Sequence, residues 1–513
     1  MTADPLQRWR LIGVAATAVI VLSVPAWLVQ NGRADAGETE IETAAFVGRE
    51  VCLPCHEQAS AAWLGSDHDL AMDVANDQTV LGDFDNATII SNGITTTFFR
   101  RERRFFVNTQ GPNGELTDFE ITHVFGHDPL QQYLVPFPGG RLQCLSIAWD
   151  RDRNEWFDLY PNQEIPPDDW LHWTRAAQNW NGMCAECHST NLKKGFDPAT
   201  KSYTTTWSEI DVSCEACHGP GSDHVAWAEI QPMARPEIEA YGLVVDTGSM
   251  TSPELVELCA PCHSRRSELG DYDHSSAALL QSHLPSLLDE GLYYADGQIL
   301  DEVYVWGSFT QSKMYANDVR CSDCHDSHSL KLKFEGNDLC LQCHRADAYD
   351  TPDHHFHKKI HEGKPSDGAL CVKCHMPEQP YMVIDERADH SLRVPRPDLS
   401  QTLGTPNACS QGGCHADKAL SWSVDAFTRW YGQAKKPHYG PALAAGREGR
   451  PDACGRWWPV GGSEVTPAGV RARALSLLWG YTGEWWAAAC AWAGACGEAR
   501  WGGGAGGGGG GVS

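Results

Sequence analysis

The feature that most constrains this chain is a five-residue pattern, Cys-x-x-Cys-His, which occurs seven times. The copies occupy residues 52–56, 184–188, 214–218, 259–263, 321–325, 340–344 and 371–375. The pattern is the attachment signature of c-type haem, in which the two thiols bond to the porphyrin. The histidine that follows ligates the iron. Seven copies therefore predict seven covalently bound haems.

An eighth site is looser, because four residues separate Cys409 from Cys414 before His415. A longer spacer can still attach haem, so we expect about eight haem c groups. The expected haem-bonding cysteines are Cys52, Cys55, Cys184, Cys187, Cys214, Cys217, Cys259, Cys262, Cys321, Cys324, Cys340, Cys343, Cys371, Cys374, Cys409 and Cys414. The expected proximal iron ligands are His56, His188, His218, His263, His325, His344, His375 and His415.

Two other interpretations of paired cysteines are less favoured. Zinc ribbons also use Cys-x-x-Cys pairs, but they do not require a histidine directly after every second cysteine. A disulfide framework is common in exported chains, yet two cysteines three residues apart rarely form a structural bridge. Cys144 stands outside every motif and is expected to be a buried core thiol.

The second axial ligand of each iron must come from elsewhere. The chain has 22 His but only 8 Met, so histidine is the default ligand, which lowers haem potentials relative to methionine. The candidate distal ligands are His68, His172, His224, His328, His355, His357, His361 and His390. Asp389 or Asp385 could hold the second nitrogen of His390. We expect His123, His127 and His438 to lie outside the ligand set, with His438 exposed.

Residues 1–33 have the composition of a targeting segment. Arg8 and Arg10 precede an uncharged run over 11–30, which is just long enough to span a bilayer. Residues 34–36 fit a signal peptidase site loosely, so a cleaved signal peptide and a retained membrane anchor are both open. Either way we expect a periplasmic or extracytoplasmic protein, because thioether attachment takes place after export.

The net charge of −27 constrains partners. Haem propionates make the mature protein more acidic still, which disfavours nucleic-acid binding. We expect redox partner proteins with a basic face.

The spacing of the motifs predicts a multihaem cytochrome c of short α-helices and irregular segments wrapped around stacked haems, with a small antiparallel β insertion. We expect a first haem segment at 47–85, a β-rich insertion at 86–160 and a domain with seven haem sites at 161–432. A helical-repeat remnant and a Gly/Trp-rich tail follow at 433–513. The expected strands are 95–100, 105–109, 116–124, 142–149 and 156–160.

Residues 451–513 differ from everything before them. They hold seven Trp, no Lys and a glycine run, which favours translation in a wrong reading frame over a genuine low-complexity tail. Residues 470–478 still have the pattern of a repeat helix.

Several segments resemble a bacterial family of multihaem c-type cytochromes whose members often carry C-terminal tetratricopeptide repeats. They are 66–72 (SDHDLAM), 129–134 (PLQQYL), 148–150 (AWD), 214–221 (CEACHGPG) and 389–397 (DHSLRVPRP). Residues 321–344 resemble the doubled CXXCH motif, with His328 three residues after His325. Residues 374–377 are similar to segments of nitrogen-cycle multihaem cytochromes. The resemblance spans about 47–432 and implies electron transfer, but the spacer at 409–415 departs from it.

Two functions fit this pattern. The first is an electron carrier through closely packed, mostly bis-His haems. The alternative is a multihaem oxidoreductase acting on a small nitrogen or sulfur compound, which needs an iron with an open axial position. No Cys-x-x-Cys-Lys site occurs, and histidines outnumber the ligands that eight haems require. The sequence therefore favours the carrier, without a substrate-converting site.

Intact mass tests the haem count. After expression with a periplasmic haem-attachment system, we expect the mass of the matured chain plus eight haems. A double variant, Cys409→Ser with Cys414→Ser, should lose one haem and keep the other seven. A wild-type mass with seven haems would remove the eighth site, and a mass without haem would refute the assignment of all eight.

Overall fold

The computed structural model describes residues 44–478, apart from 271–277, 434–436, 451–452, 454–455, 457–459 and 464–465. Backbone contacts divide the chain into two units. The small unit joins the residues up to Val47 to Pro220–Gly242, and the large unit comprises Gly48–Gly219 and the chain from Leu243 onward. In the described ranges no helix has both the length and the apolar character to cross a membrane. The expected targeting segment 1–33 and the tail beyond 478 lie outside the described residues.

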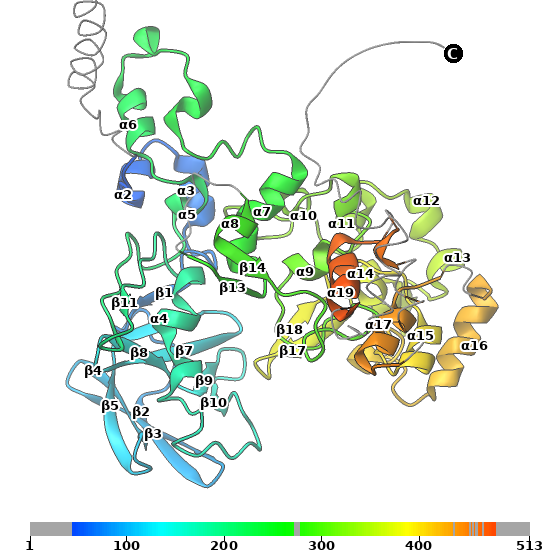
Figure 1. Ribbon diagram of the computed structural model, residues 1–513, viewed down its shortest axis with the longest axis horizontal. Coiled ribbons are helices and arrows are strands. Elements are labelled where there is room, and N and C mark those ends of the chain that lie inside the picture. The colour runs from blue at the N-terminus through cyan, green and yellow to red at the C-terminus, as the bar shows by residue number, and fades with distance from the viewer. Residues whose placement is uncertain are drawn as a thin grey trace, which may run out of the picture. The chain divides into compact units, whose positions relative to one another are not determined.

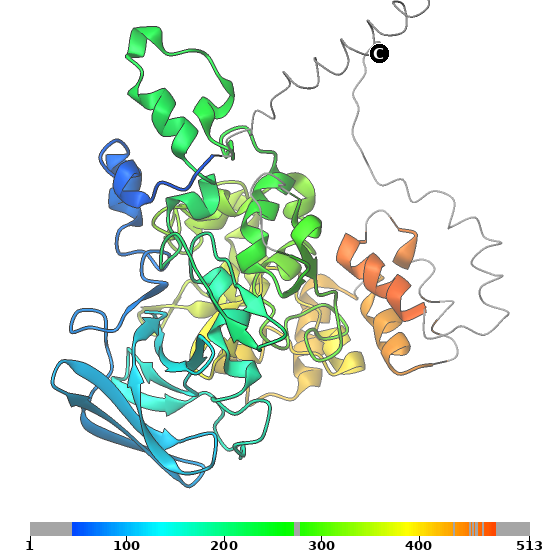
Figure 2. The same cartoon turned by 60° about the vertical axis from the view of Figure 1, so that its left-hand side comes forward.

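Two antiparallel sheets form the first part of the large unit (Figures 1 and 2). One has the order β2-β3-β4-β5. The other has the order β1-β6-β7-β9-β10, with β8 paired to β7. Their strands are β1 Met72–Val74, β2 Asp85–Ser91, β3 Ile94–Arg101, β4 Arg104–Gln110, β5 Leu116–Ile121, β6 His123–Phe125, β7 Leu130–Phe137, β8 Arg141–Cys144, β9 Ile147–Asp150 and β10 Glu155–Asp158.

The hairpin between β2 and β3 shows how local sequence sets the register. Ser91 pairs with Ile94, so only Asn92 and Gly93 form the loop. Both have positive φ, 49° and 79°. Asn-Gly suits such a two-residue turn, because these residues adopt the left-handed conformation at low cost.

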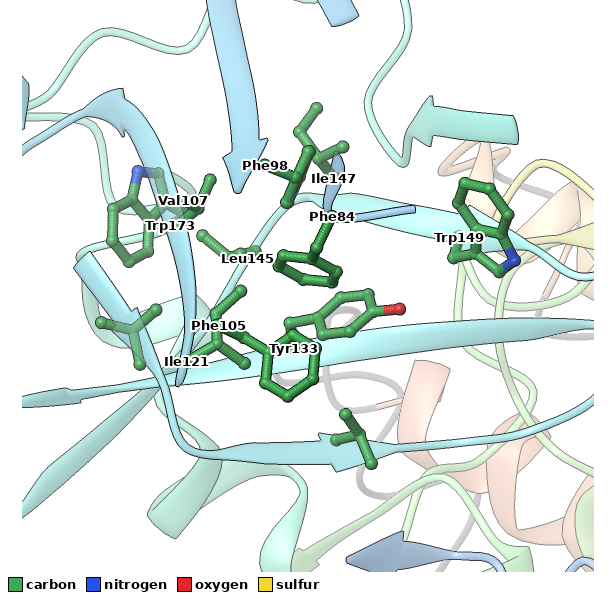
Figure 3. Close-up of a cluster of buried hydrophobic side chains, with 12 residues drawn as sticks. Phe84, Phe98, Phe105, Val107, Ile121, Tyr133, Leu145, Ile147, Trp149 and Trp173 are labelled. Atoms are coloured by element: carbon green, nitrogen blue, oxygen red, sulfur yellow. The ribbon is translucent and has the colours of Figure 1, made fainter. Parts of the chain in front are cut away.

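The two sheets share one apolar core, which Figure 3 shows. Phe98 and Phe105 come from one sheet, Tyr133 from the other, and all three are essentially inaccessible to solvent. Phe98 also stacks on Trp156, with ring centroids 3.5 Å apart. Since each buried aromatic ring removes about 150–250 Å² from water, this region has an ordinary hydrophobic core of its own.

The expected description of the fold is only partly confirmed, because the chain contains more sheet than predicted. The expected strands 95–100, 105–109 and 156–160 correspond to β3, β4 and β10, whereas 116–124 and 142–149 are each interrupted and form two strands. Strands β1, β2 and β7 were not expected. Further two-stranded pairs are β11 Phe196–Asp197 with β12 Ser202–Tyr203, β13 Arg266–Glu268 with β14 His283–Pro285, β15 Ile360–His361 with β16 Lys364–Pro365, and β17 Glu378–Tyr381 with β18 Asp385–Ala388.

The helices are short, as predicted. They are α2 Arg49–Cys52, α3 Glu57–Trp63, α4 Trp180–Met183, α5 Cys214–His218, α6 Ser222–Glu229, α7 Ser252–His263, α8 Leu279–Ser282, α9 Trp306–Phe309, α10 Cys321–Cys324, α11 Asp338–Leu341, α12 Ala346–Tyr349, α13 Pro352–His355, α14 Cys371–His375, α15 Pro397–Leu403, α16 Leu420–Tyr431, α17 Gly440–Arg447 and α19 Ala468–Leu478. Among the longest is α7, which begins with a capping box between Thr251 and Glu254.

The C-terminal helices belong to the core of the large unit. Leu443 of α17 and Val470 of α19 are fully buried and cluster with Tyr293 and Val303. The expected helix over 470–478 is therefore present, within α19. It packs against Leu288, Tyr293 and Val303 of the same unit, and the helical-repeat remnant expected at 433–513 stays a prediction.

Phe98 tests the shared core. Phe98→Ala should lower the free energy of unfolding by about 3–5 kcal/mol, because it removes a fully buried ring and leaves a cavity. Chemical unfolding followed by far-ultraviolet circular dichroism measures this change. Ile90→Ala on neighbouring β2 is the matched control, since Ile90 is 74% exposed and should cost little. Equal effects in both variants would contradict the assigned core.

Candidate haem sites

The attachment motifs lie on single helical turns. The motifs at 214–218 and 371–375 form the whole of α5 and α14, and the motif at 259–263 ends α7. Those at 52–56, 321–325 and 340–344 begin at or within α2, α10 and α11, while 184–188 contains the 3-10 turn Ala185–Cys187. Because residues three apart share one side of a helical turn, the two thiols of a motif face the same way.

Four proximal histidines each face a second imidazole from elsewhere in the large unit. His263 lies opposite His68 at 6.3 Å between ring centroids, and His325 lies opposite His390 at 6.5 Å. His375 faces His354 at 6.2 Å. His415 faces His357 at 6.1 Å.

This spacing fits a metal between the rings. With metal–nitrogen bonds of about 2 Å, two imidazoles on opposite sides of one ion have centres about 6 Å apart. Two imidazoles in direct contact would lie closer. The residues present therefore fit haem c at these sites, where the motif would supply the thiols and the two facing imidazoles would hold the iron.

Hydrogen bonds fix the tautomer of several rings. His188 Nδ1 lies 3.0 Å from the Ala71 carbonyl, His375 Nδ1 2.8 Å from that of Arg393, and His390 Nδ1 2.9 Å from that of Ala388. A carbonyl can only accept, so Nδ1 carries the proton in each. Nε2 is left with a lone pair for a metal. The expected carboxylate partner of His390, Asp389 or Asp385, is thus replaced by a backbone carbonyl.

Burial keeps these rings neutral. It lowers the pKa of His68, His188, His375 and His390, and lowers that of His263 to about 4, where the neighbouring histidines add to the effect. Only a neutral imidazole can ligate a metal, so the side chains are in the ligand-competent state at neutral pH.

His355 and His438 have the opposite tautomer. Nδ1 of His355 accepts the backbone N–H of His357 at 3.1 Å, and Nδ1 of His438 accepts that of Gly440 at 3.0 Å. The ring proton therefore sits on Nε2, which has no lone pair for iron. This hydrogen bond disfavours His355 as an iron ligand, yet its Nε2 is buried and has no hydrogen-bond partner within the described residues, so its role as a ligand stays a prediction. His438 is half-buried rather than exposed as expected, and burial lowers its pKa to about 4.

The other candidate ligands are placed as follows. His172 lies beside the sheets, with Nδ1 2.9 Å from the Thr174 hydroxyl. His328 and His361 are exposed. His224 is in the small unit, and its Nδ1 bonds the Tyr241 carbonyl at 2.9 Å, which is the ligand-type tautomer.

His354 was missed as a leading candidate, because the four histidines within 354–361 look alike in sequence. The backbone distinguishes them. Phe356 has a positive φ of 58°, and its ring stacks on Trp430 of α16 with centroids 4.8 Å apart. Tyr431 of α16 donates its hydroxyl to the His354 carbonyl. This sharp turn directs His354 and His357 to two different sites.

Neighbouring sites touch through their thiols. Pairs of interacting cysteine side chains link sites 1 and 3, 2 and 4, 4 and 5, and 6 and 7, numbered in chain order. The pairs are Cys52 with Cys214, Cys187 with Cys262, Cys259 with Cys321, and Cys340 with Cys371. Gln342 also donates to the Asp323 carbonyl at 3.1 Å, between sites 5 and 6. Cys144 is buried in the sheet region, which confirms that expectation.

Site 2 is anchored by an ion pair. Glu186, inside the motif, accepts from Arg266 at 2.5 Å and from His283 at 3.0 Å. Burial opposes the charge of Glu186, but these partners lower its pKa to about 2. Because both nitrogens of His283 are engaged, the second by Ser282 at 2.8 Å, this fully buried histidine holds β14 against the motif.

Comparison with known proteins supports this picture. The model of the doubled CXXCH motif family matches residues 314–349, and that of the cytochrome c554 and c-prime family matches residues 170–219. A search of curated proteins gives no match. Among solved structures, the outer cell wall cytochrome OcwA is similar in fold, with 18% identity, a TM-score of 0.52, and coverage of 85% of this chain and 98% of that one.

Two further structures are more distant. An undecahaem cytochrome from the S-layer of Carboxydothermus ferrireducens has 16% identity and a TM-score of 0.37, covering 88% of this chain and 71% of that one. The octahaem sulfite reductase MccA of Wolinella succinogenes has 15% identity and a TM-score of 0.31, covering 68% and 58%.

The CXXCH motifs, the two matched family models and the shared fold are those of multihaem c-type cytochromes, and the motifs are sites for haem c. The matched family models confirm the resemblance to multihaem c-type cytochromes with a doubled CXXCH motif. Tetratricopeptide repeats are not shown.

The tautomer of His390 leads to a test of whether this residue ligates an iron. His390→Ala should leave all thioethers intact but convert one iron to high spin and open it to carbon monoxide, because His325 loses its facing imidazole. Electron paramagnetic resonance and carbon monoxide difference spectra measure this. In the control, His355→Asn, the amide oxygen can still accept the His357 N–H, so every iron should stay as in wild type. A His390→Ala protein with unchanged spin states would show that His390 is not a ligand.

Proposed function

We propose that this chain is an exported cytochrome that passes electrons through about eight closely packed, mostly bis-His haems. The observation that carries the proposal is the set of four imidazole pairs spaced 6.1–6.5 Å apart. Haem supplies one-electron redox chemistry when bound. In this proposal His68, His354, His357 and His390 are distal ligands, with His354 taking the place of His355.

The chain's own contacts order the sites. Thiol pairs connect site 1 to 3, 4 to 5 and 6 to 7, and Gln342 connects 5 to 6. Sites 7 and 8 share the segment that carries His354 and His357. Site 2 meets site 4 through Cys187 and Cys262. These contacts support a continuous series of sites from site 4 to site 8, with site 2 as a branch at site 4 and with sites 1 and 3 as a neighbouring pair.

Double histidine ligation supports a carrier over an enzyme. An iron with two imidazoles has no free position for a substrate. The alternative, an oxidoreductase for a small nitrogen or sulfur compound, would require one iron outside this pattern. It gains support if the wild-type protein already contains a high-spin iron that binds carbon monoxide.

Export and partner choice belong to the same proposal. The targeting segment at 1–33 and attachment of haem after export support a place outside the cytoplasm, in keeping with the name of the cytochrome that shares the fold. The net charge of −27 supports a redox partner with a basic face.

Stopped-flow electron exchange tests this function. With a small basic redox protein as partner, all haems should be reduced and reoxidised as one connected pool. The second-order rate should fall steeply with added salt, because charges on exposed faces are screened beyond about 10 Å at 0.1 M. An acidic partner of similar potential is the control and should not slow with salt. Haems that exchange no electrons would refute the function, and a flat salt series would refute the basic partner alone.

A further inference from the structure

A mixed cluster of charged side chains lies outside every attachment motif. We call it the Arg49 cluster, and it consists of Arg49, Asp69, Glu209 and Asp211. Arg49 Nη2 contacts both carboxylate oxygens of Asp211, at 2.8 and 2.7 Å. Its Nε lies 2.6 Å from Glu209, and its Nη1 lies 3.3 Å from Asp69. Three carboxylates around one guanidinium leave two uncompensated negative charges when all are ionised.

The cluster is shielded from water. The side chains of Asp211 and Glu209 are 5% and 9% exposed. The ring of Trp63, itself 5% exposed, covers the guanidinium at 4.8 Å. Within the described residues, Oε2 of Glu209 is buried and has no hydrogen-bond partner. A buried carboxylate oxygen left unpaired is costly, and a bound proton relieves that cost.

The cluster joins three segments that carry haem sites. Arg49 precedes Cys52 of site 1 by three residues on α2, and Asp211 precedes Cys214 of site 3 by three residues. Asp69 follows His68, which faces the proximal ligand of site 4. The backbone N–H of Val212 also donates to the His68 carbonyl at 3.2 Å. Charge added at these sites therefore acts on the carboxylates through a dry region, where screening is weak.

We propose that the Arg49 cluster is a redox-linked proton-binding site, which takes up one proton on the Asp211 and Glu209 carboxylates when an adjacent haem site gains an electron. The inference rests on the proposed electron-transfer function. The electron comes from the redox partner and reduces a ferric iron, which lowers the local charge by one. The proton comes from solvent water, forms one O–H bond on a carboxylate, and restores that charge.

The pKa of Asp211 suits this role. Burial raises the pKa of Asp211 to about 6 even though Arg49 pulls it down, and the charges of Asp69 and Glu209 add to the rise. Glu215 accepts the N–H of Gly48, the residue before Arg49, at 2.8 Å, and the main-chain carbonyl of His68 accepts the N–H of Val212. The thiols of Cys52 and Cys214 do not titrate once they are thioethers.

The test is a spectroelectrochemical titration of the holoprotein across a pH series. In the wild-type protein, the midpoint potential of one haem should be constant below pH about 6, where Asp211 is already protonated. Above that pH the midpoint should fall by up to about 59 mV per pH unit, one decade in the equilibrium constant of a one-electron step. It should level off once the reduced form also loses its proton.

Variants separate the two carboxylates. Asp211→Asn should flatten the slope and hold the midpoint near its low-pH value, because the amide is neutral like the protonated acid. Glu209→Gln should lower the pH at which the midpoint potential begins to fall, since Asp211 loses a neighbouring negative charge. Asp118→Asn, on β5 beside Arg101, removes a partly exposed carboxylate elsewhere and should leave the slope as in wild type. An unchanged slope in Asp211→Asn would overturn the proposal, as would a wild-type midpoint independent of pH.

A second measurement needs no variant. Infrared difference spectra of the wild-type protein, oxidised minus reduced, should show a protonated-carboxyl band that appears on reduction and shifts in heavy water. Absence of that band would overturn the proposal even if Asp211→Asn fails to mature. A wild-type protein whose haems cannot be reversibly reduced would instead refute the proposed electron-transfer function.

Discussion

An imidazole can bind iron through Nε2 only while its proton rests on Nδ1, and backbone carbonyls hold that proton in place here. Ala71, Arg393 and Ala388 offer their carbonyls to His188, His375 and His390. Such acceptors do not titrate, unlike the carboxylates that orient metal-bound histidine in many proteins. The orientation of these rings therefore depends on how the main chain is folded, and short turns with fixed geometry become part of each site.

The fold meets this demand with two kinds of core. The sheets at 72–158 bury aromatic rings against each other and need no cofactor. Several of the helical turns that carry the motifs bury little, because α2, α10, α11 and α14 contain no buried residue. Their order depends on contacts between sites, such as the thiol pairs and the Glu186 ion pair. The chain thus combines sheets that have their own hydrophobic core with helical turns whose order depends on the haems they would bind.

The sequence predicted the attachment sites, because CXXCH is a local pattern whose chemistry leaves little choice. It predicted β3 and β4 from runs of Thr, Phe and Val, yet missed β2, although Asn92-Gly93 marks a two-residue hairpin there. Distal ligands were harder, since the pairing of His68 with His263 spans almost two hundred residues of chain. The choice of His354 over His355 depends on one hydrogen bond to the main chain, which residue identity does not encode. Two of the carboxylate partners of Arg49, Glu209 and Asp211, are likewise distant in sequence and meet it only through folding.

The turn at Phe356 has a consequence for how the array behaves as a whole. Trp430 and Tyr431 of α16 contact this turn. Within the four residues 354–357, His354 faces one site and His357 faces another. A displacement of α16 would tilt both rings in concert. Because both rings move with one turn, the midpoint potentials of the two irons would change together, and a fluctuation at one iron would also reach its neighbour.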